Sequence, residues 1–354
     1  MKHLIGAIFA TIFALTAQAQ IRWLSTEHNF GAFNEDDGKV STEFRFVNES
    51  DKALRIESVR SSCGCTVSEF SKAAVNHGDT ASISVVYNPT GRPGRFSKSL
   101  MVKLSNDSSQ RLLINGVVIG AESTLRTRFP LVAGPLRLRG NIVTFGAVKI
   151  GEMKSQFVNI YNASTSPIKP TWSNIPKYLR VTAAHDTILP GEQGVYSFSL
   201  TPSSNTQYGI LTDSLTLNVP NEKPLTIEIA AIIEENFSSM TEKQLAEAPI
   251  IQTDTDMLDF GDFATSSAPM TRQFRVTNAG KNPLLLRRLQ ISEPGISVEA
   301  SFSKLKKGKS GTVTVTFDPS KFDDSLLNAR LQIITNDPAK LMTTIRLVGI
   351  PRNK

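Results

Sequence analysis

Phe30-Gly31-Ala32-Phe33 is the first of three copies of one short motif. The motif recurs as Phe145-Gly146-Ala147-Val148 and as Phe260-Gly261-Asp262-Phe263, and each copy begins 115 residues after the one before it. Equal steps along a chain are the sequence signature of tandem structural units. The motif therefore predicts that the chain repeats one fold three times.

Two further features keep their distance from the phenylalanine of each copy. One predicted strand ends at an asparagine, 18, 17 and 18 residues after the phenylalanine: Asn48, Asn162 and Asn278. A later predicted strand ends at a proline, 59, 57 and 59 residues after it: Pro89, Pro202 and Pro319. The repeat therefore extends over the whole unit and is not limited to the Phe-Gly pair.

Apolar and polar residues alternate along the predicted strands. In the third copy, Val313, Val315 and Phe317 alternate with threonines. A period of two with β-branched and aromatic residues is typical of strands that bury one face. Turn sequences such as Lys307-Gly308-Lys309 separate the strands. Several short strands in about 100 residues predict an all-β protein of three tandem immunoglobulin-like β-sandwich domains.

The first residues predict export. Lys2 precedes an apolar run from Leu4 to Leu15, and Ala17-Gln18-Ala19 follows with the small-x-small pattern that signal peptidase accepts. The run is too short to span a bilayer as a stable anchor. We therefore expect residues 1–19 to be a signal peptide and the mature chain to have no transmembrane anchor. The expected location is the periplasm, with the cell surface as the alternative.

The repeat frame predicts the domain boundaries. The three domains are expected at 20–120, 136–233 and 249–354. A basic linker at 121–135 and a polar linker at 234–248 separate them. In the polar linker, Ser239 and Glu242 have the spacing of a capping box, which predicts one short helix there.

Composition and charge bear on the kind of partner. Apolar residues make up 40% of the chain and charged residues 20%, which is ordinary for globular proteins. The formal charge of +7 favours anionic neighbours, so we expect an envelope protein or an anionic polysaccharide as partner. We expect no nucleic acid partner, because few aromatic residues accompany the basic ones. Four arginines at the first linker form a candidate contact region, with a solvated linker as the alternative: Arg126, Arg128, Arg137 and Arg139.

The first unit resembles a known family through one segment in particular. Ser61-Ser62-Cys63-Gly64-Cys65-Thr66-Val67 stands between Phe46-Val47-Asn48 and Tyr87-Asn88-Pro89. This order is similar to a bacterial exported domain family of unknown function, within the Hydin-like and major-sperm-protein-like group of immunoglobulin-type sandwiches. The resemblance implies an immunoglobulin-like fold and an exported location, and it implies no activity. The other two units lack the cysteines, so they resemble only the broad group.

Cys63 and Cys65 are the only cysteines of the chain. On a straight strand their thiols would face one side, too far apart for a relaxed disulfide, but Gly64 permits a kink. A local disulfide or a pair of buried thiols is one hypothesis, since oxidation is the default outside the cytosol. Binding of a soft cation such as Cu(I), or disulfide exchange, is the other. Zinc would need two further ligands, for which His28 and His77 are the nearby candidates.

Enzyme signatures are missing from the sequence. Gly308-Lys309-Ser310 lacks the earlier glycine of a phosphate-binding loop, and no Gly-x-Ser-x-Gly or His-Glu-x-x-His pattern occurs. The aspartates suggest calcium but lack the glycine of a calcium loop, which leaves a non-standard calcium site at the domain junction as an alternative: Asp254, Asp256, Asp259 and Asp262. We therefore expect a non-catalytic, exported binding or scaffolding protein without a cofactor. The alternative is thiol redox or soft-metal handling through Cys63 and Cys65.

Overall fold

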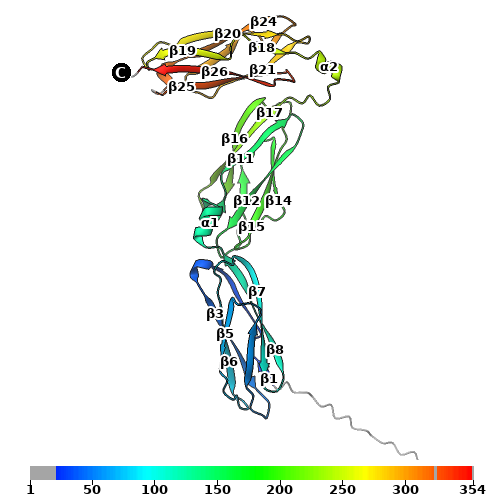
Figure 1. Cartoon of the computed structure of the whole chain (residues 1–354), viewed down its shortest axis with the longest axis vertical. Coiled ribbons are helices and arrows are strands. Elements are labelled where there is room, and N and C mark those ends of the chain that lie inside the picture. The colour runs from blue at the N-terminus through cyan, green and yellow to red at the C-terminus, as the bar shows by residue number, and fades with distance from the viewer. Residues whose placement is uncertain (1–20, 323–324, 353–354) are drawn as a thin grey trace, which may run out of the picture. The chain divides into compact units, whose positions relative to one another are not determined.

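The structure is a computed structural model that describes residues 21–322 and 325–352. The predicted signal peptide lies outside these ranges. Strands dominate the described part of the chain, which confirms the all-β fold class (Figure 1). Within these ranges, every helix is too short or too polar to cross a membrane.

Residues 21–119 form two four-stranded sheets that share one core. The first sheet has the order β1 (Ile21–Trp23), β3 (Val40–Asn48), β6 (Thr80–Tyr87) and β5 (Thr66–Phe70). The second has the order β2 (Glu27–Asn34), β8 (Ser109–Ile119), β7 (Gly94–Leu104) and β4 (Ile56–Ser61). Side chains from both sheets, among them Phe44 and Leu100, belong to one buried cluster. The two sheets therefore pack as a β-sandwich, here called the first sandwich.

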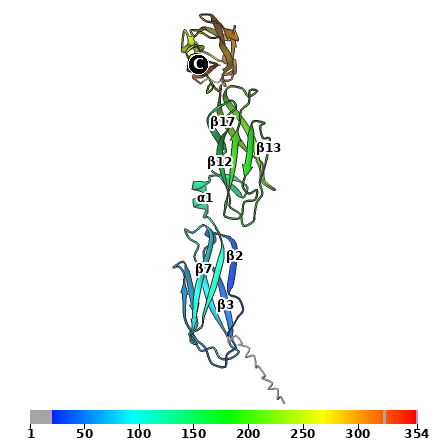
Figure 2. The same cartoon turned by 90° about the vertical axis from the view of Figure 1, so that its right-hand side faces the viewer.

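Residues 131–234 form a second pair of sheets, the second sandwich, which Figure 2 shows from the side. One sheet has the order β14 (Leu179–Ala183), β15 (Gln193–Leu200), β12 (Lys154–Asn162), β10 (Leu136–Leu138) and β9 (Leu131–Ala133). The other has the order β11 (Ile142–Lys149), β17 (Leu225–Glu234), β16 (Gly209–Asn218) and β13 (Thr171–Ser173).

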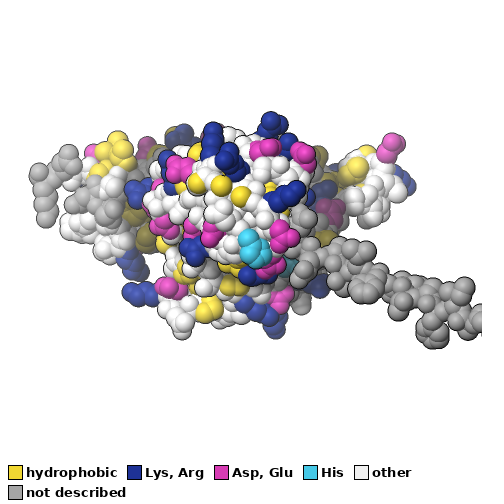
Figure 3. All heavy atoms as spheres, turned by 90° about the horizontal axis from the view of Figure 1, so that it is seen from below, with side chains coloured by type: hydrophobic (Ala, Val, Ile, Leu, Met, Phe, Trp, Pro, Cys, Tyr) yellow, Lys and Arg dark blue, Asp and Glu magenta, His cyan; other side chains and the backbone are white. Residues whose placement is uncertain are grey.

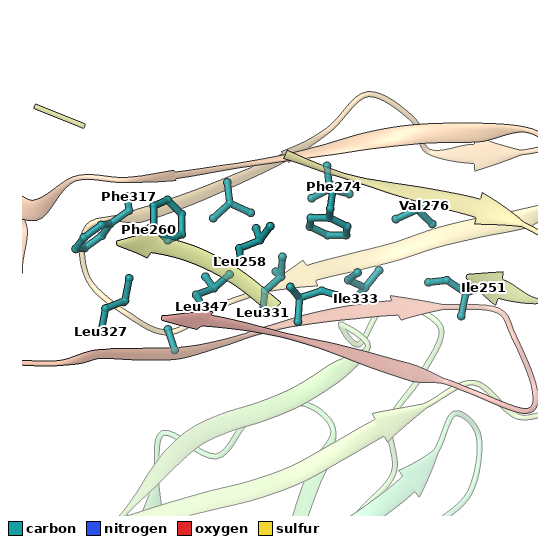
Figure 4. Packing of buried hydrophobic residues seen from close by; sticks show 14 of the residues in the cluster. Ile251, Leu258, Phe260, Phe274, Val276, Phe317, Leu327, Leu331, Ile333 and Leu347 are labelled. Carbon is teal, nitrogen blue, oxygen red and sulfur yellow. The ribbon is translucent and has the colours of Figure 1, made fainter. Parts of the chain in front are cut away.

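Residues 251–351 form the third sandwich. Its first sheet has the order β18 (Ile251–Thr253), β20 (Met270–Asn278), β24 (Ser310–Phe317) and β22 (Ile296–Ala300). Its second has the order β19 (Met257–Phe263), β26 (Met342–Pro351), β25 (Leu327–Thr335), β21 (Leu284–Gln290) and β23 (Lys304–Leu305). Figure 4 shows the core between these sheets, with Phe274 and Phe317 from one sheet facing Leu331 and Leu347 from the other.

The predicted basic linker is largely ordered into regular structure. It contains helix α1 (Glu122–Arg128) and strand β9, which pairs with β10. A two-residue turn joins the two strands, with Gly134 at a φ of +58° where a glycine is favoured. Residues expected to connect two domains therefore belong to helix α1 and to the second sandwich.

A short helix is present in the predicted polar linker, but its cap differs from the one expected. Helix α2 spans Glu242–Ala246, and Thr241 is its N-cap. The Thr241 hydroxyl accepts from the Gln244 amide, and the Gln244 side chain accepts from the Thr241 amide. Thr-x-x-Gln fills the same role as Ser-x-x-Glu. The expected capping pair, Ser239 and Glu242, was wrong because it lies two residues before Thr241 and Gln244, the pair that caps the helix.

By its contacts, the chain divides into two compact units. One holds the described residues up to Pro130, with Tyr161–Ile168 and Ile188–Gln193. The other holds Leu131–Ile160, Lys169–Thr187 and the described residues from Gly194 onward. The division into three domains therefore stays a prediction.

The Phe-Gly motif is a β-bulge in all three sandwiches. It lies where the first long strand pairs in parallel with the last one, as β2 with β8, β11 with β17, and β19 with β26. The strand register shifts at the motif in each pair. The glycines Gly31, Gly146 and Gly261 have φ values of +69°, +66° and +71°. The sequence repeat therefore marks a backbone conformation that residues with a Cβ adopt only at a cost.

Gly146→Ala is expected to lower the free energy of unfolding of the second sandwich by about 1–2 kcal/mol, because an L residue is strained at this φ. An added Cβ would meet only the Lys154 Nζ, at an ordinary 3.7 Å, so sterics add little. Gly146→Asn should lose less, since asparagine tolerates the left-handed region better. Urea unfolding followed by Trp172 fluorescence in a Trp23→Phe background measures both. Gly140→Ala is the control, because its Cβ enters open space without a positive φ, and an equal loss there would contradict the prediction.

The asparagine that ends a strand in each copy is fully buried and makes the same bonds each time. The side-chain amide of Asn48, Asn162 or Asn278 donates to two backbone carbonyls, one four residues on and one 26 or 27 residues on. Its oxygen accepts from the backbone amide two residues on. The sequence repeat at this position is therefore a repeated polar network inside the sandwich.

Candidate functional site

Cys63 and Cys65 form a disulfide in the turn that joins β4 to β5. Their Cα atoms lie 5.4 Å apart. The Thr66 amide donates to the Cys63 carbonyl at 3.4 Å, and the Asn88 amide donates to the Cys65 carbonyl at 3.0 Å. The two residues lie in a turn and not on a straight strand, which is the kink that Gly64 permits. The local disulfide is therefore the arrangement that the structure shows.

The two sulfur-bearing residues differ in burial. Cys65 is 7% exposed and belongs to the core of the first sandwich, whereas Cys63 is half-buried and Gly64 is exposed. The hydroxyl of buried Thr66 lies 3.8 Å from the Cys63 sulfur and 3.9 Å from the Cys65 sulfur. Because disulfide sulfurs carry no hydrogen, the Thr66 hydroxyl is the donor, and its single hydrogen can point to only one sulfur at a time. The disulfide thus has a solvent side, a core side and a hydroxyl facing both sulfurs.

The other two sandwiches build the same turn without cysteine. In each of these sandwiches, the residue before the edge strand accepts a hydrogen bond through its backbone carbonyl. The donor is the backbone amide of the residue that follows the neighbouring strand. The Tyr178 carbonyl accepts from the Thr201 amide at 2.8 Å, and the Gly295 carbonyl accepts from the Asp318 amide at 2.8 Å. Tyr178 and Gly295 therefore occupy the place of Cys65. Burial, with a hydrogen bond to the Asp213 carboxylate, raises the pKa of the Tyr178 phenol.

The candidate metal ligands have other contacts. The His28 ring lies edge-on to Phe30, with centroids 4.6 Å apart, and the His77 Nδ1 lies 3.1 Å from the Ser50 carbonyl oxygen. The Asp254 and Asp259 carboxylates accept from the backbone amides of Arg275 and Gly261. In the described ranges no three histidine, cysteine or acidic residues are grouped so that they could hold a metal ion.

The four predicted contact arginines do not lie on one linker. Arg126 and Arg128 are on α1, where Arg126 pairs with Glu122 at 3.6 Å and the Arg128 guanidinium lies 5.8 Å from the Phe129 ring centroid. Arg137 is on β10, and Arg139 follows this strand. On the face that Figure 3 presents, basic and acidic side chains are interspersed, so the positive charge there does not gather in one patch.

Arg137 shares a solvent-facing sheet surface with exposed apolar residues. Leu136 and Leu138 are buried, so Arg137 between them points away from the core. On the same side of this sheet, Phe157 of β12 is 69% exposed, Val195 of β15 is 50% exposed and Val132 of β9 is 53% exposed. Arg180 of β14 is also exposed there. We call these five residues the Phe157 face.

The Phe157 face was missed because an aromatic residue on a strand suggests a core position. A signal was present in the repeat frame. Phe157 lies five residues before Asn162, where the first and third copies have the exposed polar residues Glu43 and Gln273. Val195 lies five residues before Leu200, where the other copies have Ser82 and Thr312. The second sandwich therefore carries apolar residues at outward positions that are polar in its sister sandwiches.

A family model for proteins of unknown function, DUF1573, matches residues 21–118 and 251–349, which together are more than half of the chain. The match includes the third unit, so the expectation that the family resemblance is confined to the first unit was wrong. No curated protein matches the sequence.

Two of the solved structures that are similar to the chain illustrate the comparison. One is a protein of unknown function from Porphyromonas gingivalis W83, which is 17% identical, with a TM-score of 0.49, over 61% of this chain and 100% of that one. The other is the ASH/PapD-like domain 7 of human CEP192, which is 13% identical, with a TM-score of 0.24, over 30% of this chain and 92% of that domain.

Proposed function

This chain belongs to the DUF1573 family of proteins of unknown function, and we propose that it is an exported, non-catalytic protein that binds or scaffolds other components of the cell envelope. The predicted signal peptide supports export to the periplasm. Tandem sandwiches offer broad, rigid sheet surfaces for a partner, which supports a binding role. The missing enzyme motifs support the absence of catalysis.

The Phe157 face is the observation that carries this proposal. Exposed large apolar side chains that lie together on a sheet surface mark interaction sites more often than isolated ones do. Aromatic and arginine side chains are enriched where partners bind tightly. Phe157 and Val195 replace residues that are polar in the sister sandwiches, so the sandwich fold does not require them to be apolar. A surface for a partner explains their presence.

The charge of the face favours an acidic partner. Arg180 is exposed among its outward strand positions, and none of these positions holds an aspartate or glutamate. The three apolar residues of the same face favour a protein that brings apolar side chains together with carboxylates. We therefore propose an acidic envelope protein as the partner, and an anionic polysaccharide is the alternative class.

Phe157→Ser tests this proposal. Envelope extract is passed over the immobilised mature chain, the retained protein is identified and purified, and its affinity is measured by calorimetry. We expect the substitution to weaken binding at least about tenfold, because an anchoring aromatic contributes more than 1.4 kcal/mol. Met257→Ser is the matched control, since Met257 is an exposed apolar residue of β19, and it should bind as the native chain does.

Equal affinity of the native chain and the Phe157→Ser variant would contradict the proposed face. The polysaccharide class would be favoured if an added anionic polysaccharide displaces the protein partner at low ionic strength and the Phe157→Ser substitution does not change this displacement. Unfolding curves of both variants should match that of the native chain, because both side chains are exposed.

A further inference from the structure

The disulfide is an addition to a turn that folds without it. Tyr178 and Gly295 stand at the position of Cys65 and keep the same backbone hydrogen bond. The turns of the second and third sandwiches therefore close the same end of the core with ordinary residues. Loop closure between residues two apart in sequence constrains the unfolded chain little, so the bond contributes little through this effect. A structural staple does not account for the two cysteines.

The asymmetric burial of the disulfide gives it a direction of reaction. An external thiolate can approach from the Cys63 side, where Cys63 is half-buried and Gly64 is exposed with open space above it. Cys65, at 7% exposed, is closed to attack by the core of the first sandwich. Exchange requires the attacking thiolate to reach one sulfur while the other leaves. Cys63 is therefore the attacked sulfur and Cys65 the leaving one.

Thr66 is placed to assist the departure of Cys65. Its hydroxyl oxygen lies within 3.8 and 3.9 Å of the Cys63 and Cys65 sulfurs, so its hydrogen can turn to either one. When the S–S bond breaks, negative charge develops on the Cys65 sulfur at the edge of the core. A hydrogen bond to a charged acceptor is stronger than one to a neutral acceptor. The Thr66 hydroxyl therefore stabilises the leaving thiolate more than it stabilises the intact disulfide.

We infer that Cys63 and Cys65 are a thiol–disulfide exchange site that oxidises a dithiol. One thiolate of the dithiol attacks the Cys63 sulfur, the Cys63–Cys65 bond breaks, and its electron pair leaves on the Cys65 sulfur. In the mixed disulfide, one sulfur of the dithiol is bonded to Cys63. The second thiolate of the dithiol attacks that sulfur, and the Cys63 thiolate leaves. The dithiol becomes a disulfide, and two electrons and two protons pass to the cysteines. This chemistry is separate from binding at the Phe157 face.

Dithiothreitol, a small dithiol, tests the inference on the mature chain under native conditions. Alkylation after quenching, read by mass spectrometry, counts the thiols formed with time. We expect the native chain to gain two thiols while folded, and Thr66→Val to react roughly tenfold more slowly because the leaving thiolate loses its donor. Thr66→Ser keeps the hydroxyl and should react at nearly the native rate. Thr343→Val removes a buried hydroxyl elsewhere, and Phe157→Ser alters the binding face, so neither should change the rate.

Three results would overturn the inference. The first is a disulfide that stays oxidised until urea unfolds the chain. The second is Thr66→Val reacting as fast as the native chain while both have the same unfolding midpoint. The third is complete reduction by glutathione, a monothiol, at the rate seen with dithiothreitol, because a dithiol site resolves its mixed disulfide intramolecularly.

Discussion

Asn48→Ala is expected to lower the free energy of unfolding of the first sandwich by about 3 kcal/mol. The Asn48 amide donates to the carbonyls of Lys52 and Val75, both at 2.8 Å, and its oxygen accepts from the Ser50 amide and hydroxyl. The side chain is fully buried, so water cannot replace these partners. Alanine therefore loses the bonds and leaves the Val75 carbonyl without this donor inside the sandwich.

Trp23 is a local reporter for this variant. Its ring is tilted against that of Phe46, with ring centroids 4.9 Å apart, and β1, which carries Trp23, pairs with β3 next to Asn48. Urea unfolding followed by Trp23 fluorescence in a Trp172→Phe background measures the loss. Asn106→Ala is the matched control, because Asn106 also accepts from the amide and hydroxyl of a serine two residues on, but in an exposed turn. Its loss should stay below about 1 kcal/mol, and similar losses for both variants would refute the role of burial.

Phe317→Ala is expected to lower the free energy of unfolding of the third sandwich by about 3–5 kcal/mol. The Phe317 ring is fully buried and meets Phe260, Phe263 and Phe322 edge-on, at centroid distances of 5.6, 5.0 and 5.5 Å. Alanine leaves a cavity among aromatic rings that a sheet-on-sheet core cannot collapse to fill. The repeat motif itself loses support, because Phe260 belongs to it.

Hydrogen exchange read by mass spectrometry locates this effect. Amides of β20 and β24 should exchange faster in the variant, while those of the first sandwich should be unchanged. Phe157→Ala makes the same chemical change at a side chain that is 69% exposed, and it should cost less than about 0.5 kcal/mol. Equal effects of the two substitutions would show that the core assignment of Phe317 is wrong.

The sequence alone predicted the features that rest on local pattern. Apolar residues alternate with threonines from Val313 to Phe317. This alternation predicts a strand whichever strands pair with it, because the pattern depends only on which face is buried. The repeated Phe-Gly and asparagine positions likewise follow from backbone and hydrogen-bonding needs that recur in each copy. The all-β class was predicted for these reasons, and the repeat frame also contained the unused signal at Phe157.

Only the tertiary structure decided which side chains meet. The disulfide between Cys63 and Cys65 and the Thr66 hydroxyl facing it depend on how the turn between two strands is placed in space. The Ser239 cap was wrong because two overlapping capping patterns compete, and Thr241 with Gln244 is the pair that caps α2. Local preferences determine the strands and their spacing, whereas contacts between distant residues depend on the sum of many weak interactions that a pattern does not contain.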